Sequence, residues 1–478
     1  MTCHRTLGSF EQFQNALFFR GMRSSYIFTP HDGQICSIPD HHAWDSNTAS
    51  RYDAICRALG CRALDRIEIG FTTEEVIDAI DHQLAHLTLG VTQDCNFRCD
   101  YCIYSGEFSG LRSHSRTYMS EDTAIASADY LVAHCSQARK DLFCTFYGGE
   151  PFLNFPVIRS TVDHLSHVLK ERIRFSVTTN GSLLDREVRR FLIDNRIFLS
   201  ISIDGDRESH DRHRRFCDGR PTFDHVIACI DKLRHEDEAY FNLYVTFAVT
   251  LTGDTDYLVL DEFFSRYPNN VKVSGVMFYG SQTIRPVRGN SRNISLMIEK
   301  FLEGCRTRAF DNEESRQPYR FASSVISRGL RAIHNRRVAE TVLFDGTYAL
   351  TKHCIPGATK LFVAPDGVFY PCEKLDSHTH LAIGDFEHGV DKETVMRLLH
   401  EYLTLRDSHC RECYLIDICD YCFQSASDGH GWDEQKMELH CEYAREEYAR
   451  AFSLYAQILE EDGSALDFLD NQPDRFNR

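Results

Sequence analysis

The chain has 478 residues, 42% of them apolar, which is enough material for two or three folded domains. Charged residues make up 26%, an ordinary globular value that excludes a disordered or fibrous chain. The net charge of −17 argues against nucleic-acid binding, and the absence of any run of eighteen apolar residues argues against a membrane span. The first seven residues lack the apolar stretch of a secretory signal, so we expect a cytoplasmic protein with reduced cysteines.

The elements expected along the chain begin with a small α+β module. Residues 25–28 and 32–36 predict two short strands around a turn, and residues 50–59 predict a helix. From residue 86 onward, apolar strands alternate with amphipathic helices, which predicts a parallel α/β sheet, either a barrel or a doubly wound fold. The expected strands are 86–91, 142–147, 173–178, 198–203, 243–249 and 271–278, and the clearest helices are 120–134 and 157–169.

The alternation ends near residue 345, where a loop-rich segment with many cysteines begins. An amphipathic helix is expected at 442–459, and an acidic tail that frays is expected after it. The predicted units are an N-terminal module (1–84), an α/β core (85–310), a linker or bridging region (311–344), a cysteine-rich domain (345–459) and the tail (460–478).

Nineteen cysteines in a reducing compartment call for an explanation other than disulfides. Nine are scattered and are interpreted as buried small hydrophobic residues. Ten are clustered, and clustering lets several thiolates converge on one metal centre. The clustered residues are Cys95, Cys99, Cys102, Cys354, Cys372, Cys410, Cys413, Cys419, Cys422 and Cys441.

The first cysteine set follows the first strand of the α/β core. Cys95, Cys99 and Cys102 have the spacing C-x3-C-x2-C, with Tyr101 before the last cysteine. Three thiolates are one short of filling a [4Fe–4S] cluster, and a structural zinc site would need a fourth ligand nearby. The motif resembles the signature of radical S-adenosylmethionine (SAM) enzymes. That resemblance implies an iron without a protein ligand, which chelates the methionyl amino and carboxylate groups of SAM.

Further motifs follow in the order that this family has them, over residues 85–305. Glycines at the end of the second strand let the backbone approach a ligand, and the glutamate after them can pair with an ammonium group. The resemblance implies a partial (β/α)6 barrel of TIM type with its site at the carboxyl ends of the strands. The expected SAM-binding residues are Tyr101, Gly148, Gly149, Glu150, Asn180, Ser202, Asp204 and Arg214.

The late cysteine set is similar to a SPASM domain, the seven-cysteine module that holds two auxiliary [4Fe–4S] clusters. Carried over from that family, Cys410, Cys413, Cys419 and Cys441 fill one cluster. The remaining residues Cys354, Cys372 and Cys422 hold the other cluster and leave one site open. The final C-x2-C is one residue shorter than usual, which leaves the partition between the clusters open. Two zinc knuckles are the alternative.

The resemblance implies reductive cleavage of SAM to a 5′-deoxyadenosyl radical, with a flavodoxin or ferredoxin as the electron donor. Within the SPASM group, the segment 102–120 resembles the maturases of ribosomally made peptides (ranthipeptides and sactipeptides), which form thioethers from cysteine. We therefore expect a precursor peptide as substrate and oxidative crosslinking as the reaction. Residues 24–64 are either a reduced leader-recognition module or a scaffold cap.

Other reactions remain open from the sequence. Carbon–carbon crosslinking is one, and formylglycine formation by an anaerobic sulfatase maturase is another, although that group has an Asp base where this chain has Glu373. A peptide epimerase needs a thiol that returns a hydrogen atom, for which Cys217 is a candidate unless it is a buried bystander. Glu373 and Cys217 are thus the candidate catalytic residues. An iron–sulfur electron-transfer protein is the non-enzymatic alternative.

Overall fold

In the computed structural model, most of the chain beyond the N-terminal 65 residues is described. All structural statements below concern these residues, which are 11–13, 16–30, 34–38, 66–106, 111–138, 141–267, 269–275, 277–279, 283–285, 291–335, 347–350, 354–416, 418–419 and 421–470.

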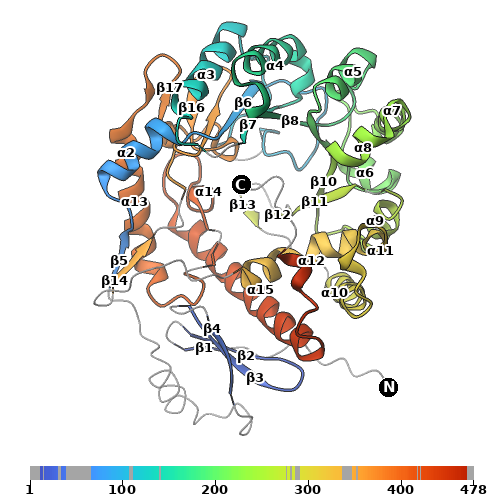
Figure 1. Ribbon diagram of the computed structural model, residues 1–478, viewed down its shortest axis with the longest axis vertical. Helices are drawn as coiled ribbons and strands as arrows, with labels where there is room; N and C mark the ends of the chain where they lie inside the picture. Colours follow the sequence, from blue (N-terminus) through green and yellow to red (C-terminus); the bar gives the residue numbers. More distant parts are fainter. Residues whose placement is uncertain are drawn as a thin grey trace.

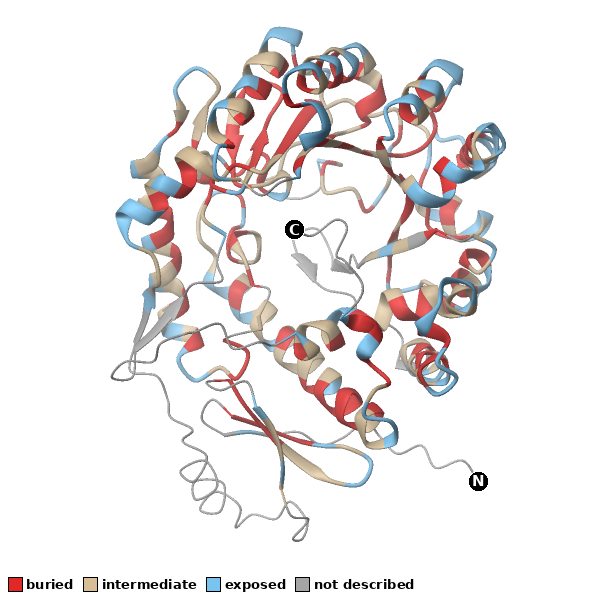
Figure 2. Cartoon of the chain, in the orientation of Figure 1, coloured by how far each residue is buried: buried red, intermediate tan, exposed pale blue. Residues whose placement is uncertain are grey.

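Six parallel strands form the curved sheet of the α/β core, in the spatial order β11-β10-β9-β8-β7-β6. This confirms the predicted partial barrel. In β7, β8 and β9 buried residues alternate with half-buried ones, whereas β6 is buried along nearly its whole length. The buried residues of the core lie in the strands and on the helix faces turned toward them (Figure 2). The strands are β6 (His86–Thr92), β7 (Leu142–Gly148), β8 (Ile173–Thr179), β9 (Phe198–Ser202), β10 (Val245–Leu251) and β11 (Asn270–Gly275).

Helices cover the outer face of this sheet (Figure 1). Several begin at a side chain that accepts a hydrogen bond from the first turn, as Ser120 does before α3 and Asp185 before α5. Their apolar faces and the outward side chains of the strands form one core. The helices are α3 (Glu121–His134), α4 (Phe155–Leu169), α5 (Arg186–Asp194), α6 (Arg207–His213), α7 (Phe223–Glu236), α8 (Glu238–Tyr244) and α9 (Tyr257–Phe264).

The structure differs from the sequence prediction at the last core strands. Residues 243–244 belong to α8, so β10 begins two residues later than predicted. The predicted strand 271–278 is interrupted after β11, and β12 (Met277–Tyr279) pairs instead with β13 (Thr283–Arg285). Leu243, Tyr244 and Val245 form an apolar and aromatic run across the boundary between α8 and β10, so the residue pattern does not mark that boundary.

The domain boundary predicted near residue 345 does not separate two sheets, because strands from both sides of it belong to one sheet. β15 (Lys360–Val363) lies parallel to β6 and extends the core sheet to ten strands. An antiparallel meander follows, formed by β16 (Val368–Tyr370), β17 (Gly384–Asp385) and β18 (Gly389–Val390). The cysteine-rich segment is therefore anchored to the strand that precedes the first cysteine loop.

The remaining helices pack beside the cysteine-rich segment and beside the last elements of the core (Figure 1). α12 packs against both α15 and β11, so the region between the predicted units contains structured, bridging elements. None of the helices within the described ranges is long and apolar enough to cross a membrane. The elements are α2 (Thr73–His82), α10 (Ser291–Arg306), α11 (Glu313–Arg316), α12 (Arg320–His334), α13 (Lys392–Cys410), α14 (Phe423–Ala426) and α15 (Glu434–Glu461), with β5 (Arg66–Ile69) pairing with β14 (Thr347–Leu350).

The N-terminal module contains a four-stranded antiparallel sheet that packs on α15 (Figure 1). Its strands are β1 (Glu11–Phe13), β2 (Ala16–Arg20), β3 (Ser25–Thr29) and β4 (Gln34–Ile38). The two predicted strands correspond to β3 and β4. Phe19 and Phe28 contact Phe452 of α15, with ring centroids 5.3 and 4.5 Å apart. The helix predicted at 50–59 lies outside the described residues.

The prediction of a fraying acidic tail is wrong for residues 460–470. Leu466, Phe468 and Leu469 are buried in the core beneath α15, because apolar residues alternate with the acidic ones. The Glu460 carboxylate accepts hydrogen bonds from the backbone amides of residues 22–24, at 2.7–3.1 Å, and from the Tyr26 hydroxyl at 2.7 Å. Helix α15 also extends beyond the predicted 442–459 at both ends.

We expect Glu460→Ala to weaken the docking of the N-terminal sheet by about 1–3 kcal/mol, because it leaves several donors of the β2–β3 turn without their charged acceptor. Amide hydrogen exchange of residues 21–28 measures this effect. Glu461→Ala is the matched control, since Glu461 pairs with Arg306 at the surface and should cost less than about 1 kcal/mol. Equal exchange rates in the two variants would contradict the assignment.

Candidate active site

The first cysteine set lies on the loop directly after β6, at the carboxyl end of the barrel strands. The Cys95 amide donates to Asp94 Oδ1 at 2.8 Å, and the Phe97 amide donates to Cys95 Sγ at 3.4 Å. Burial raises the pKa of all three thiols, that of Cys99 to about 12. Such thiols become thiolates at neutral pH only beside strong positive charge, which bound iron would supply.

The glycine turn at the end of β7 is hydrogen-bonded to the backbone at the start of the cysteine loop. The Gly149 amide donates to Thr92 O at 2.9 Å, and the Glu150 amide donates to Asp94 O at 2.8 Å. A Cβ atom on Gly149 would lie 2.1 Å from Asp94 O, and Gly148 has a φ of 142°. Only glycine allows this close contact between two backbones.

Glu150 is fully buried at the base of the site. Its carboxylate accepts hydrogen bonds from Thr179 Oγ1 and from the Asn180 amide, both at 2.7 Å. Burial raises its pKa to about 7, although these hydrogen bonds act in the opposite direction. A cationic ligand group beside this carboxylate would hold it in the charged form, as expected for the ammonium group of SAM.

Asn180 connects the end of β8 to the cysteine loop. Its amide nitrogen donates to Asn96 Oδ1 at 2.8 Å and lies 3.9 Å from Cys95 Sγ. Its oxygen accepts from the Ser182 amide and hydroxyl, at 2.9 and 2.6 Å, so the amide orientation is fixed. Ser202, the last residue of β9, is half-buried.

The other predicted SAM-binding residues form a buried trio. Arg214 Nε donates to Asp204 Oδ2 at 2.8 Å, and the Tyr101 hydroxyl donates to the same carboxylate. The Thr250 amide also donates to Asp204, at 3.0 Å. Arg214 is therefore held by Asp204 beside the cysteine loop, and its predicted contact with the carboxylate of SAM remains a prediction.

We expect acid to destabilise the fold through His210, which is buried behind this trio with its Nε2 3.0 Å from Thr222 Oγ1. Burial, reinforced by Arg214, lowers the pKa of His210 from 6.5 to about 4. Below pH 6.5 the unfolded chain binds a proton that the folded chain rejects, so stability is lost as the pH falls from 6.5 to 4, by on the order of 3 kcal/mol.

Urea unfolding of the metal-free protein at pH 7.5 and pH 5 measures this effect. His210→Gln should reduce the loss of stability on acidification. His388→Gln, at an exposed histidine, should behave as wild type. An unchanged pH dependence in His210→Gln would contradict the role of His210.

Four cysteines of the late set line one cavity, as the predicted partition requires. Cys410, at the end of α13, and Cys413, Cys419 and Cys441 line one small hollow together with Arg406, His409 and apolar neighbours. Burial raises the pKa of Cys441 to about 12, and the neighbouring Cys410 and Cys413 add to the shift. The four sulfur donors thus suit one buried iron–sulfur cluster.

The other three late cysteines also lie near one another. Burial raises the pKa of Cys354 to about 11 and that of Cys372 to about 12, and the proximity of Cys422 adds to both shifts. Lys360 is the nearby cation. The assignment of these three residues to a second cluster stays a prediction.

Of the two candidate catalytic residues, Glu373 is placed unfavourably for a base, and the position of Cys217 does not assign it a role. Burial alone would raise the pKa of Glu373, but Lys360, whose Nζ lies 2.7 Å from its carboxylate, lowers the pKa overall. A carboxylate held in this way is a weak base. Cys217 is exposed rather than buried, on a turn whose backbone amide donates to Asn96 O at 3.0 Å.

The sequence did not predict the set of contacts, centred on Arg112, that joins the first cysteine loop to the segment after Cys372. Arg112 lies over the Tyr104 ring and pairs with Asp376. A tyrosine two residues after a cysteine is a weak signal, and nothing in the sequence links positions 112 and 376.

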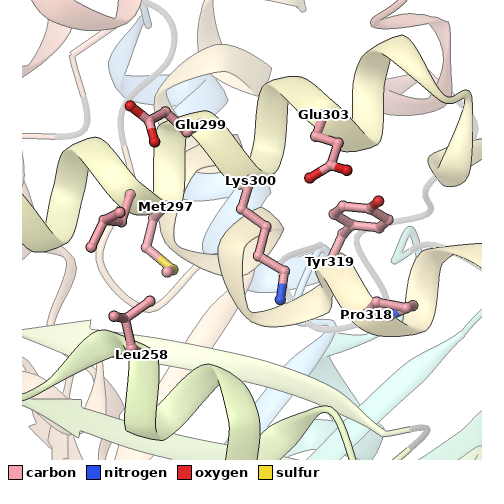
Figure 3. Close-up of a pocket in the computed structure, with 8 residues that line it drawn as sticks. Leu258, Met297, Glu299, Lys300, Glu303, Pro318 and Tyr319 are labelled. Carbon is pink, nitrogen blue, oxygen red and sulfur yellow. The ribbon is translucent and has the colours of Figure 1, made fainter. Parts of the chain in front are cut away.

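A separate hollow lies outside the barrel, between α9 and α10 (Figure 3). Leu258 and Met297 form its apolar side, and Lys300 extends along it toward Tyr319. The Lys300 ammonium pairs with Asp261, so the charge is already neutralised. None of the cysteine or glycine motifs contributes to this hollow.

Comparison with known proteins places the core in a defined class. Residues 89–257 match the Radical SAM superfamily. A radical SAM cyclopropyl synthase, TigE, from Paramaledivibacter caminithermalis is 23% identical over 75% of this chain and 69% of its own length. A cysteine-type anaerobic sulfatase-maturating enzyme from Clostridium perfringens is 29% identical over 30% of this chain, and the match spans 39% of that enzyme.

The same fold occurs in a solved structure described as native anSMEcpe with bound AdoMet and the Cp18Cys peptide. The TM-score is 0.55 at 16% identity, over 82% of this chain and 100% of that one. The fold, the three-cysteine loop and the superfamily match identify residues 89–257 as a radical SAM domain. The [4Fe–4S] cluster and the SAM expected for such a domain fit the three thiols of the loop after β6 and the Gly148–Gly149 turn beside them.

Proposed function

We propose that this enzyme is a peptide maturase that oxidatively crosslinks a ribosomally made precursor, with thioether formation from a cysteine as the first candidate reaction. When bound, the first cluster and SAM would supply a 5′-deoxyadenosyl radical that removes a hydrogen atom from the peptide. Thioether formation breaks one C–H and one S–H bond and forms one C–S bond. The peptide therefore loses two hydrogen atoms, and the second electron must leave through the protein.

The observation that carries this proposal is the hollow lined by four of the late cysteines. The set of four around one cavity suits a closed cluster that accepts an electron. The set of Cys354, Cys372 and Cys422 suits an iron with one open position, to which a substrate thiolate could bind. The Lys360 ammonium beside this set favours the thiolate form.

Carbon–carbon bond formation is the second candidate, supported by the long match to the cyclopropyl synthase. Formylglycine formation is less favoured, because Glu373 stands where the sulfatase maturases have an Asp base and is paired with Lys360. The peptide partner is expected to bind through its leader at an edge of the β1–β4 sheet by strand addition. A flavodoxin or ferredoxin is the expected reductant.

Co-expression with a candidate precursor, followed by mass spectrometry, tests the proposal. A peptide that, after treatment with a thiol reductant, still lacks two hydrogens and does not react with iodoacetamide indicates a thioether, whereas retained thiol reactivity together with the loss of two hydrogens indicates a carbon–carbon bond. An aldehyde with loss of sulfur indicates formylglycine, and deuterium uptake without other change indicates epimerisation. A modification without net oxidation of the peptide would overturn the proposal.

A further inference from the structure

A buried arginine connects the first cysteine loop to the C-terminal part of the chain. The Tyr104 carbonyl accepts from the His114 amide at 3.0 Å, and Ser105 pairs with Ser113 as an isolated bridge. This hairpin places the Arg112 guanidinium 3.5 Å from the centroid of the Tyr104 ring. Tyr104 is two residues after Cys102, so Arg112 is fixed close to the first cluster site.

The other side of the guanidinium faces the segment after Cys372. Arg112 Nε donates to Asp376 Oδ2 at 2.5 Å, and the two side chains are 8% and 4% exposed. The Tyr104 hydroxyl donates to the Glu373 carbonyl at 3.3 Å. Two contacts therefore join the segment after Cys102 to the segment after Cys372.

These contacts do not satisfy all the hydrogen-bond donors of the Arg112 guanidinium. Its Nη1 atom is buried and has no hydrogen-bond partner among the described residues. The guanidinium lies between the Asp376 carboxylate and the ring of Tyr104. The residue after Tyr104, Ser105, donates its backbone amide to the Cys102 carbonyl at 2.9 Å, so this position adjoins the first cysteine loop.

We propose that Arg112 is a positioning residue that raises the reduction potential of the cluster held by Cys102, and that Asp376 opposes it from the C-terminal segment. Reduction adds one negative charge to a cluster, so a nearby buried cation favours the reduced state and a nearby anion disfavours it. A unit charge within roughly ten ångströms, at an effective dielectric constant of about 20, changes such an equilibrium on the order of tenfold. The loop after Cys372 thereby adjusts how readily the first cluster is reduced.

A redox titration followed by electron paramagnetic resonance, on the full chain with reconstituted clusters, tests this role. The signal of the first cluster is identified by its loss from the Cys95→Ala, Cys99→Ala, Cys102→Ala variant. In Arg112→Met we expect about a tenfold lower ratio of reduced to oxidised cluster at a fixed potential, which for one electron is a shift of about 59 mV to more negative values. Asp376→Asn should shift the potential in the opposite direction, and Arg112→Lys should remain near wild type.

Arg159→Met is the matched control, because Arg159 also lies over an aromatic ring, that of Phe155, and pairs with a carboxylate, that of Glu187, on the exterior. It should leave the potential unchanged. If Arg112 were only a structural clamp, the reduction potentials of Arg112→Met and Asp376→Asn would shift in the same direction, or the potential of Arg112→Lys would shift as far as that of Arg112→Met. Either result would overturn the inference. A wild-type enzyme without the first-cluster signal would overturn the proposed cluster as well, which distinguishes the two failures.

Discussion

Replacing Cys95, Cys99 and Cys102 together by alanine is expected to abolish formation of 5′-deoxyadenosine from SAM. The three thiols are the sulfur donors of the loop after β6, and the Glu150 and Asn180 contacts orient that loop around them. For the three proposed [4Fe–4S] clusters, iron should fall from about twelve to about eight atoms per chain. Iron analysis and chromatography of anaerobic reaction mixtures with a strong reductant measure both quantities.

The control for this variant uses cysteines that serve only as core residues. Cys135 and Cys229 are buried and belong to neither cysteine set, so their joint replacement by alanine should keep the iron content and the product unchanged. If the variant at positions 95, 99 and 102 retains all its iron, or forms 5′-deoxyadenosine at the wild-type rate, the first site is wrongly assigned.

The strands of the barrel could be predicted because each contains several apolar residues, alternating or adjacent, and is followed by glycine or polar residues. The cysteine, glycine and asparagine motifs lie at the ends of β6, β7 and β8, and parallel strands bring those ends to one edge. Local pattern and topology together therefore located the site without knowledge of any contact.

Contacts between distant segments could not be predicted in the same way. Arg112 and Asp376 are 264 residues apart, and Glu460 binds a turn more than 430 residues before it. Each of these residues is an ordinary charged residue in the sequence. Their partners follow only from the way β15 joins the core sheet and α15 supports the N-terminal sheet.

The ion pair of Glu373 is another contact, near the site, that the sequence did not predict. The sequence offers Glu373 as a base because it follows a cluster cysteine. The antiparallel pairing of β15 with β16 brings Lys360 to within 2.7 Å of its carboxylate, and the pKa falls instead of rising. A residue's position beside a motif indicates proximity to the chemistry, whereas its charge state depends on neighbours from other segments.

Gly149→Ala is expected to disable the site although it changes no ligand. The added Cβ would lie 2.1 Å from Asp94 O and 3.1 Å from Cys95 Cβ, and the first contact is with backbone that cannot rotate away. The cysteine loop must therefore move relative to β7. We expect a loss of stability of about 1–3 kcal/mol, as for overpacking of a core, together with loss of iron from the first site and at least a tenfold loss of 5′-deoxyadenosine formation.

Gly253→Ala provides the comparison, because no heavy atom lies within 4 Å of a Cβ at that position. Thermal unfolding, iron content and product formation in this variant should match the wild type. The decisive quantity is the iron bound by Gly149→Ala after reconstitution, since a cysteine loop that tolerates the methyl group would bind it normally. Normal iron and normal SAM cleavage in Gly149→Ala would mean that the contact between the glycine turn and the Asp94 carbonyl does not define the geometry of the site.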